Sequence, residues 1–415
     1  MRRRWTVSLI ILSLGGVMSS ASAAPPSCFG RRATIVGTDG SDVISGTRHA
    51  DVIVGRGGGD RIEGNGGDDR ICGGSGGDSL DGGGGRDSIM GQGERDLFVG
   101  GPGNDRLKGG SGVRDRVSYA LASGPVSVDL AEGIATGEGR DALNGIEWAD
   151  GSASGDRLRG DWHDNGLVGG RGNDDIAGRS GFDTLTGGGG DDSIAGGGGL
   201  GDEANYAGAS GPVQVDLLAG VATGRGADTL SGVENLTGSG SDDTLIGNRR
   251  NNEIFGGRGM DTIEGRPDDD TLVGGPNSDS LFGGSGIDAF VGAGGNDVLS
   301  GGDGSFDAVS YAGASRRVNA DLQAGTAEGQ GVDALSGLEV LVGSRFGDRL
   351  AGDDGDNYLF GGPGGDVLIG RGGDDYLLGF TGPDDLAGGT GEDTLDGGPG
   401  TDSCRNGEHR SGCES

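Results

Sequence analysis

The sequence is poor in the residues that build an ordinary protein core. Only 4% of its 415 residues are aromatic and 32% are hydrophobic, which excludes a core of packed Leu, Ile and Phe. It has ten prolines, far too few for collagen, which also needs Gly at every third position. Lys occurs once, and 65 Asp and Glu against 32 Lys and Arg give a net charge of −33. Such a chain repels nucleic acid and anionic membranes and attracts cations.

Recognisable catalytic motifs are also missing. There are three His, no H-E-x-x-H sequence and no His pair at metal-ligand spacing, which argues against zinc protease chemistry. A G-x-S-x-G match at 73–77 lacks the strand-turn-helix context that gives this motif its meaning. We therefore predict no catalytic residue and no organic cofactor. Carboxylate pairs are abundant, so a polysaccharide-acting enzyme of the lyase or epimerase type stays open as an alternative.

The N-terminus has the features of a signal peptide. Arg2, Arg3 and Arg4 precede an apolar stretch at 7–17 that is too short to span a bilayer. Ala21-Ser22-Ala23 is a small-x-small cleavage site, so we expect cleavage after Ala23. No later run approaches the length of a membrane span. The sequence therefore predicts a signal peptide at 1–23, a secreted protein without a membrane span after cleavage, and a lead-in segment at 24–36.

Four cysteines enter an oxidising environment if the chain is exported. No two of them are three residues apart, so a C-x-x-C zinc or redox pair is absent. Of the three possible pairings we expect Cys28–Cys72 and Cys404–Cys413, which would place one staple at each end of the chain. Free thiols are the alternative.

Glycine, by contrast, supplies 102 residues, and it follows a repeat of nine. The pattern is G-G-x-G-x-D-x-U-x, where U is a large apolar residue. It predicts four repeat arrays at 37–108, 151–195, 238–300 and 343–405, separated by insert blocks at 109–150, 196–237 and 301–342 and followed by a Cys-containing tail at 406–415. The arrays hold 27 units, whose first residue is always Gly and whose sixth is Asp in 24 units and Asn in three. Chance does not fix columns in this way.

The spacing predicts an all-β solenoid. Gly at positions one, two and four permits left-handed turns and close backbone approach, and the residues x-U-x form a three-residue strand that buries one side chain. Two units then make one coil, and stacked coils make a narrow two-faced parallel solenoid. One Ile or Leu per nine residues is too thin a core to offset the ordering entropy of so much glycine. Stacking also aligns the Asp side chains, which repel unless a hard cation lies between them, and flexible oxygen-rich turns suit Ca²⁺ better than Mg²⁺.

On these motifs the chain resembles the hemolysin-type calcium-binding repeat family, whose RTX nonapeptide has this pattern. The resemblance covers 37–405 and implies a parallel β-roll that holds several Ca²⁺ ions between its turns, with metal binding as part of folding. It implies that the sixth-position Asp is the side-chain ligand, together with turn carbonyls. The expected ligands are Asp42, Asp60, Asp69, Asp78, Asp87, Asp105, Asp174, Asp183, Asp192, Asp261, Asp270, Asp279, Asp288, Asp297, Asp366, Asp375, Asp384, Asp393 and Asp402.

Some units depart from the pattern and should bind calcium poorly. Asn165, Asn252 and Asn357 lack the charge of the sixth-position Asp. In other units the fourth-position Gly is replaced, for example by His49, Glu94, His163 and Arg250.

The three insert blocks are related to one another. They share Tyr119, Tyr206 and Tyr311, then Asp129, Asp216 and Asp321, then Glu147, Glu234 and Glu339, and each contains an alternating segment that reads as a strand. One interpretation is a ligand or carbohydrate surface built on Tyr, Asp and Glu. The other is a wider coil in which Tyr and Val fill the interior and the acids satisfy turns.

Together these features predict an exported calcium-binding β-roll, without a catalytic domain, that has a structural, surface or matrix role. Its expected partners are calcium ions and a cell-surface or matrix polysaccharide, with no nucleic acid. An adhesin built on the solenoid is a further alternative to the enzyme.

Overall fold

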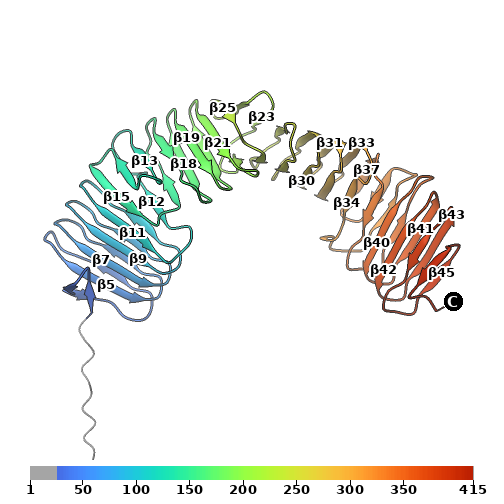
Figure 1. The fold of residues 1–415 in the computed structure, drawn as a ribbon, viewed down its shortest axis with the longest axis horizontal. Helices are drawn as coiled ribbons and strands as arrows, with labels where there is room; N and C mark the ends of the chain where they lie inside the picture. Colours follow the sequence, from blue (N-terminus) through green and yellow to red (C-terminus); the bar gives the residue numbers. More distant parts are fainter. Residues whose placement is uncertain (1–25, 415) are drawn as a thin grey trace, which may run out of the picture.

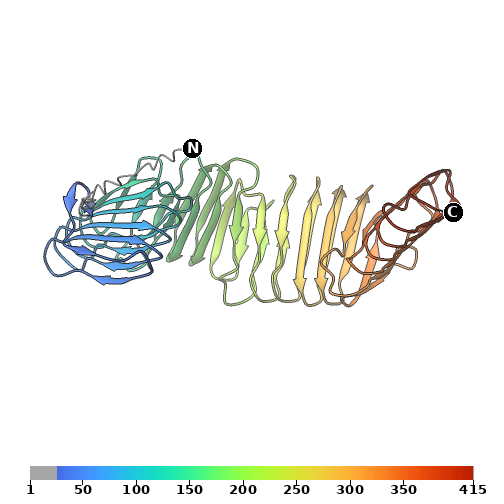
Figure 2. The ribbon, with the colours of Figure 1, turned by 90° about the horizontal axis from the view of Figure 1, so that it is seen from below.

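The computed structural model describes residues 26–414 as an all-β chain without a helix. Within that range nothing helical is therefore long or apolar enough to cross a membrane. The signal peptide expected at residues 1–23, with its cleavage site after Ala23, lies outside the described residues. The chain winds into a long two-sheet solenoid that curves into an arch (Figure 1), and the side view shows the strands lying across its length (Figure 2).

Successive strands alternate between two sheets, which we call the inner and outer sheets. The inner sheet runs in the order β4 (Val43–Ser45), β6 (Arg61–Glu63), β8 (Ser79–Asp81), β10 (Leu97–Val99), β12 (Arg116–Ser118), β16 (Trp148–Asp150), β18 (Gly166–Arg171), β20 (Thr184–Gly189), β22 (Glu203–Asn205), β26 (Asn235–Thr237), β28 (Glu253–Phe255), β30 (Thr271–Pro276), β32 (Ala289–Gly294), β34 (Ala308–Ser310), β38 (Val340–Val342), β40 (Tyr358–Pro363), β42 (Tyr376–Thr381), β44 (Thr394–Asp396) and β46 (His409–Ser411).

The outer sheet is longer. It runs in the order β3 (Ile35–Val36), β5 (Val52–Gly57), β7 (Arg70–Ser75), β9 (Ser88–Gln92), β11 (Arg106–Gly110), β15 (Arg140–Asn144), β14 (Ile134–Thr136), β13 (Ser127–Asp129), β17 (Arg157–Arg159), β19 (Asp175–Ser180), β21 (Ser193–Gly198), β25 (Ala227–Ser231), β24 (Val221–Thr223), β23 (Gln214–Asp216), β27 (Thr244–Ile246), β29 (Thr262–Pro267), β31 (Ser280–Gly286), β33 (Val298–Gly304), β37 (Val332–Ser336), β36 (Thr326–Glu328), β35 (Asn319–Asp321), β39 (Arg349–Ala351), β41 (Val367–Gly372), β43 (Asp385–Thr390) and β45 (Ser403–Arg405).

The repeat units stack in parallel register at a spacing of two units. In the inner sheet Ile62 pairs with Leu80, 18 residues on, and Leu80 pairs with Phe98 in the same way. Each of these three side chains is 0% exposed, while its strand neighbours are partly exposed. The predicted parallel solenoid, with one buried apolar side chain per unit, is therefore confirmed.

Each insert block widens only the outer sheet. In the first block β14 pairs antiparallel with both β13 and β15, while β15 pairs parallel with β11 and β13 pairs parallel with β17. The inner sheet gains no extra strand there, because β12 pairs directly with β16. The second and third blocks repeat this arrangement. In the described part of the chain the outer sheet thus has 25 strands and the inner sheet 19. In Figure 1 the outer sheet follows the convex side of the arch.

A disulfide closes each end of the solenoid. Cys28, from the antiparallel pair β1 (Ser27–Cys28) and β2 (Arg31–Arg32), is bonded to Cys72 on β7. Cys404 on β45 is bonded to Cys413 in the tail. These are the two pairings expected from the sequence, and the described residues contain no free cysteine.

Candidate metal site

The sixth-position carboxylates form two ladders, one along each edge of the solenoid. In each ladder the backbone N–H of one Asp donates a hydrogen bond to Oδ1 of the Asp one coil further on. At one edge Asp60 N–H donates to Asp78 Oδ1 at 2.8 Å, and Asp78 N–H donates to Asp96 Oδ1 at 2.8 Å. At the other edge Asp69 N–H donates to Asp87 Oδ1 at 2.8 Å. Stacking of units 18 residues apart therefore orients every carboxylate in the same way.

The second oxygen of these carboxylates is buried without a hydrogen-bond partner. A buried polar atom normally has a partner, so one such atom in a structure calls for an explanation. Here the same atom, Oδ2, is involved in twenty residues: Asp60, Asp69, Asp78, Asp87, Asp96, Asp105, Asp115, Asp174, Asp183, Asp192, Asp202, Asp261, Asp270, Asp279, Asp288, Asp366, Asp375, Asp384, Asp393 and Asp402. A buried oxygen that repeats in this way is what a cation-binding turn presents to its ion.

Each free oxygen lies in a cradle that only glycine leaves open. A Cβ added to Gly82, the first residue of its unit, would collide with Asp87 Oδ2 and would lie 2.8 Å from the carbonyl oxygen of Gly100 in the next coil. The first Gly of the other units with a free oxygen meets its own Asp in the same way. This explains why position one is Gly in every unit: the Asp oxygen and a backbone carbonyl converge there, and a side chain would fill the space.

Burial raises the pKa of most of these carboxyl groups from the usual 3.8. Desolvation is the largest cause, neighbouring acidic groups add to it, and the backbone hydrogen bond to Oδ1 opposes it. The pKa rises to about 6 for Asp69, Asp78, Asp87, Asp192, Asp261, Asp288 and Asp297. It rises to about 7 for Asp96, Asp105, Asp174, Asp183, Asp270, Asp279, Asp366 and Asp375. Without a cation the ladders thus take up protons close to neutral pH.

The structure places all nineteen sequence-predicted ligands on the ladders, and seventeen of them have the free Oδ2. Asp42 differs, because its Oδ2 accepts hydrogen bonds from the backbone N–H of Thr38 at 2.6 Å and from its hydroxyl at 3.0 Å. Asp297 is buried and accepts the N–H of Asp279 through Oδ1 at 3.0 Å.

Three further residues with a free oxygen were missed by the sequence reasoning. Asp96 follows Glu94, which replaces the fourth-position Gly, and Asp115 and Asp202 stand in the units that carry one extra residue. The signal that survives in all three is an Asp two residues before a buried apolar side chain.

In other units the sixth-position carboxylate or amide accepts hydrogen bonds from its own turn. Where Thr or Ser replaces the second Gly, the hydroxyl and backbone N–H bind the sixth-position side chain, as when Ser239 Oγ donates to Asp243 Oδ1 at 2.9 Å. In the Asn units the side-chain oxygen accepts a backbone N–H from its own turn, at 2.7 Å for Asp161 N–H to Asn165 Oδ1. These units have no free buried oxygen. That the Asn units bind calcium poorly stays a prediction.

The insert blocks end the ladders. In the first block Asp105 N–H donates to Asp141 Oδ1 at 2.9 Å, and Asp141 Oδ2 accepts the hydroxyl of Tyr119 at 2.8 Å. On the other edge Asp115 N–H donates to Glu147 Oε2 at 2.9 Å. Asp228 with Tyr206 and Asp333 with Tyr311 repeat the first arrangement. The three Tyr rings are 2–7% exposed. The shared Tyr and Glu therefore act inside the solenoid and not as a contact surface.

The shared Asp of each block also has an internal partner. Asp129 accepts a bidentate pair from Arg179, 50 residues on, with Nη1–Oδ1 2.9 Å and Nη2–Oδ2 2.6 Å. The same Asp caps its own turn by accepting the N–H of Glu132 at 3.0 Å. Asp216 with Arg266 and Asp321 with Arg371 repeat the pairing. The interpretation of the blocks as structural coils is the one that these contacts support.

Tyr119→Phe is expected to lower the free energy of unfolding by about 1–3 kcal/mol, because Asp141 Oδ2 would be buried without its partner. Urea unfolding in saturating calcium measures this. Tyr376→Phe is the matched control, since Tyr376 is half-exposed on the inner sheet. Equal midpoints for the two variants would contradict the role of the Tyr119 hydroxyl at the end of the ladder.

The donor set favours calcium over transition metals. Within residues 26–414 no group of three or more His, Cys, Asp or Glu side chains converges on one point. A site in these turns would therefore combine one or two carboxylate oxygens with backbone carbonyls, and hard oxygen donors of this kind suit Ca²⁺. The free Oδ2 atoms, the carbonyls beside them and the glycine cradle fit that ion.

Comparison with known proteins agrees with this geometry. A family model described as the RTX calcium-binding nonapeptide repeat, which spans four copies, matches residues 31–62, 45–80, 81–113, 141–176, 168–200, 237–272, 273–305, 342–377 and 378–408. No curated protein matches the chain. The matches cover more than half of the chain and leave out most of each insert block. The chain therefore belongs to the RTX calcium-binding nonapeptide repeat family.

Proposed function

We propose that the protein is an exported calcium-binding scaffold whose repeats fold into the solenoid when the ladder carboxylates bind Ca²⁺. The observation that carries this proposal is the set of twenty buried Asp Oδ2 atoms without a partner. The ligands are those Asp residues, with turn carbonyls beside them. They include Asp96, Asp115 and Asp202, while Asp42 and the Asn units contribute less.

The energetics support a folding role for the ion. A buried polar group without a partner costs about 1–3 kcal/mol, and more when it is charged. The summed cost of twenty such groups exceeds the usual net stability of a folded protein, about 5–15 kcal/mol. An ionised ladder without metal therefore opposes folding. A bound cation removes this cost, and each site adds about 2.7 kcal/mol when free calcium is a hundred times its Kd.

Export is part of the proposal. The two disulfides support it, because such bonds persist in oxidising compartments. Calcium is abundant outside cells and scarce inside them, so the chain would remain unfolded until it is exported. A structural role at a surface or in a matrix fits a molecule whose shared insert-block residues are occupied in internal contacts.

The test is far-UV circular dichroism of the mature protein at pH 8, first in chelator and then with added Ca²⁺ or Mg²⁺. A coil spectrum in chelator should become a β spectrum with Ca²⁺ but not with equal Mg²⁺, and chelator should reverse the change. Reduced and alkylated protein provides the control for the disulfides. A full β spectrum in chelator at pH 8 would refute calcium-driven folding.

A further inference from the structure

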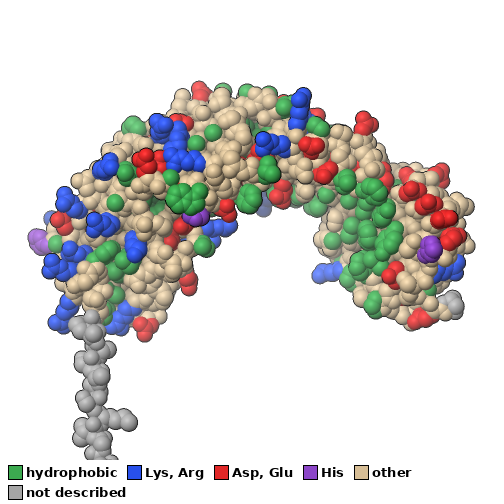
Figure 3. Space-filling model, in the orientation of Figure 1, with side chains coloured by type: hydrophobic (Ala, Val, Ile, Leu, Met, Phe, Trp, Pro, Cys, Tyr) green, Lys and Arg blue, Asp and Glu red, His purple; other side chains and the backbone are tan. Residues whose placement is uncertain are grey.

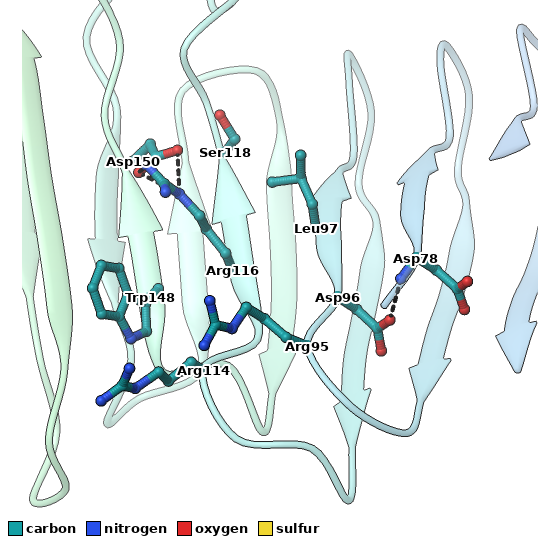
Figure 4. A pocket seen from close by; sticks show the side chains of 9 residues that line it. All are labelled: Asp78, Arg95, Asp96, Leu97, Arg114, Arg116, Ser118, Trp148 and Asp150. Atoms are coloured by element: carbon teal, nitrogen blue, oxygen red, sulfur yellow. Dashed lines mark hydrogen bonds and ion pairs between the residues drawn. The ribbon is translucent and has the colours of Figure 1, made fainter. Parts of the chain in front are cut away.

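A pocket of about 320 Å³ lies on the exposed face of the inner sheet at the first insert block. Leu97, Arg116 and Trp148 line it from the neighbouring strands β10, β12 and β16, and Arg95 and Arg114 reach it from the preceding turns. Figure 4 shows Arg95, Arg114 and Trp148 gathered on one side of the pocket. The ladder residues Asp78 and Asp96 lie on the other side and are 2–3% exposed.

The indole of Trp148 lies flat on the sheet. A Cβ added to Gly166, its partner on β18, would collide with three ring carbons of Trp148, Cδ2, Cε3 and Cε2. Gly166 has no side chain that would tilt the ring away, and Trp148 is only half-buried, so one face of the indole is presented outward. A flat apolar plate of this size suits the C–H face of a sugar ring, which it contacts through dispersion over its whole area.

Three Arg side chains lie beside the Trp148 ring, and two of them have no acidic partner. The third, Arg116, is held by Asp150, with its Nε at 2.8 Å from Oδ1 and 2.7 Å from Oδ2. Arg95 and Arg114 are exposed, and neither forms an ion pair or side-chain hydrogen bond with the described residues. Guanidinium groups bind carboxylates in bidentate fashion, so the two free Arg side chains provide a site for an anion next to the Trp148 ring.

The charge of this limb of the arch favours the same ligand. Residues 26–160 contain 15 Lys and Arg against 21 Asp and Glu, whereas residues 161–414 contain 14 against 44. Ten of the 21 acids in the first segment are buried, so its outward surface is basic in a protein of net charge −33. Figure 3 shows most of the visible Lys and Arg side chains on the N-terminal limb and the crest of the arch.

The three insert blocks provide an internal comparison. The three blocks share the same Tyr, Asp and Glu, but the Trp and Arg residues of the pocket occur only in the first block. Trp148, Arg114 and Arg116 correspond to Asn235, Gly201 and Glu203 in the second block, and to Val340, Phe306 and Ala308 in the third. The surface at the third block is apolar, and it continues onto the next two strands of the inner sheet, where Tyr358 on β40 and Tyr376 on β42 are stacked at 6.0 Å between ring centroids. The fold therefore tolerates many residues here, and folding does not explain the Arg–Trp set of the first block.

We propose that this pocket binds a uronate unit of an extracellular acidic polysaccharide. The sugar ring stacks on Trp148, and its carboxylate pairs with Arg95 and Arg114. Asp150 holds Arg116 in place at the rim. This inference goes beyond calcium-dependent folding and rests on the proposed role outside the cell. Its failure would leave the circular dichroism result unchanged.

Binding of trigalacturonate to the calcium-loaded protein tests the pocket. In a Trp162→Phe background the mature chain keeps Trp148 as its only Trp, so its fluorescence reports directly. We expect saturable quenching by trigalacturonate and none by neutral maltotriose. Trp148→Asn and Arg114→Gly, which install the residues of the second block, should each weaken binding about tenfold or more, as truncating an anchoring Trp or Arg typically does. The Trp148→Asn variant is followed by calorimetry.

The matched control is Trp162→Ala, because Trp162 is 67% exposed and does not line the pocket. It should bind as the unaltered protein does, and every variant should keep the calcium midpoint measured by circular dichroism. Wild-type affinity in Trp148→Asn would overturn the proposal. Equal affinity for hexaglutamate, lost in the same variants, would also overturn it, since charge alone would then explain binding and an acidic peptide would be the better ligand.

Discussion

Metal-free protein is expected to gain β-sheet as the pH falls from 8 to 5.5. Burial raises the pKa of Asp87 to about 6 and that of Asp105 to about 7, from 3.8. A raised pKa in the folded state means that folding takes up protons, so this contribution to stability is complete below about pH 4 and is lost as the pH rises through 6 to 7. Far-UV circular dichroism in chelator, read at intervals of half a pH unit, measures the effect.

Calcium should reverse this dependence. The ligands bind the ion when deprotonated, so the protein in millimolar calcium should keep its β spectrum from pH 8 down to about 6, and apparent calcium affinity should fall as the pH falls further. A metal-free chain with identical spectra at pH 8 and 5.5 would show that the ladder carboxylates do not control folding.

Gly82→Ala is expected to disrupt its coil, whereas Gly84→Ala in the same unit should be nearly silent. A Cβ at Gly82 would meet Asp87 Oδ2 and the Gly100 carbonyl oxygen, and the latter belongs to backbone that cannot swing aside. A Cβ at Gly84 meets nothing within 4 Å, and neither residue has a left-handed φ. Overpacking of this kind costs about 1–3 kcal/mol, and blocking the Asp oxygen should also remove a calcium site.

Hydrogen exchange in saturating calcium is the appropriate measurement, because each repeat contacts mainly its neighbours and the damage should remain local. Peptides that cover β7, β9 and β11 should exchange faster in Gly82→Ala than in Gly84→Ala, while peptides beyond the first insert block should not change. Equal protection in the two variants would refute the cradle as the reason for Gly at position one.

Most of the fold could be predicted from the nine-residue period of the sequence. Residues 61–63 and 79–81 are strands β6 and β8, at the last three positions of their units, and the buried residue is the predicted one. Such local regularity is readable because each unit repeats the same turn, strand and burial. The expected disulfides followed from sequence position alone, because Cys28 and Cys72 lie near the N-terminus and Cys404 and Cys413 near the C-terminus.

Features that depend on contacts between coils could not be predicted. Asp141 ends a ladder because it stacks on Asp105, 36 residues earlier, after the chain has made the extra strands β13 and β14. The free oxygens of Asp115 and Asp202 depend on the same stacking, which overrides the extra residue in their units. The pocket joins Arg95 to Trp148, 53 positions apart, and only the return of β16 to the side of β12 brings them together.

The unequal strand counts of the two sheets also determine the curvature of the molecule. Each insert block adds two strands to the outer sheet alone, a wedge of about 10 Å between sheets that lie about 10 Å apart. Such a wedge tilts the solenoid axis by roughly 55°, and three wedges in the same direction add up to roughly 165°. Figure 1 shows the solenoid bent into an arch with the outer sheet on its convex side. Each coil of two nine-residue units adds one strand to both sheets, so it lengthens a limb without adding a wedge. Length and bend are thus encoded separately, and a gene that gained or lost one block would change the direction of a limb while leaving every coil within it intact.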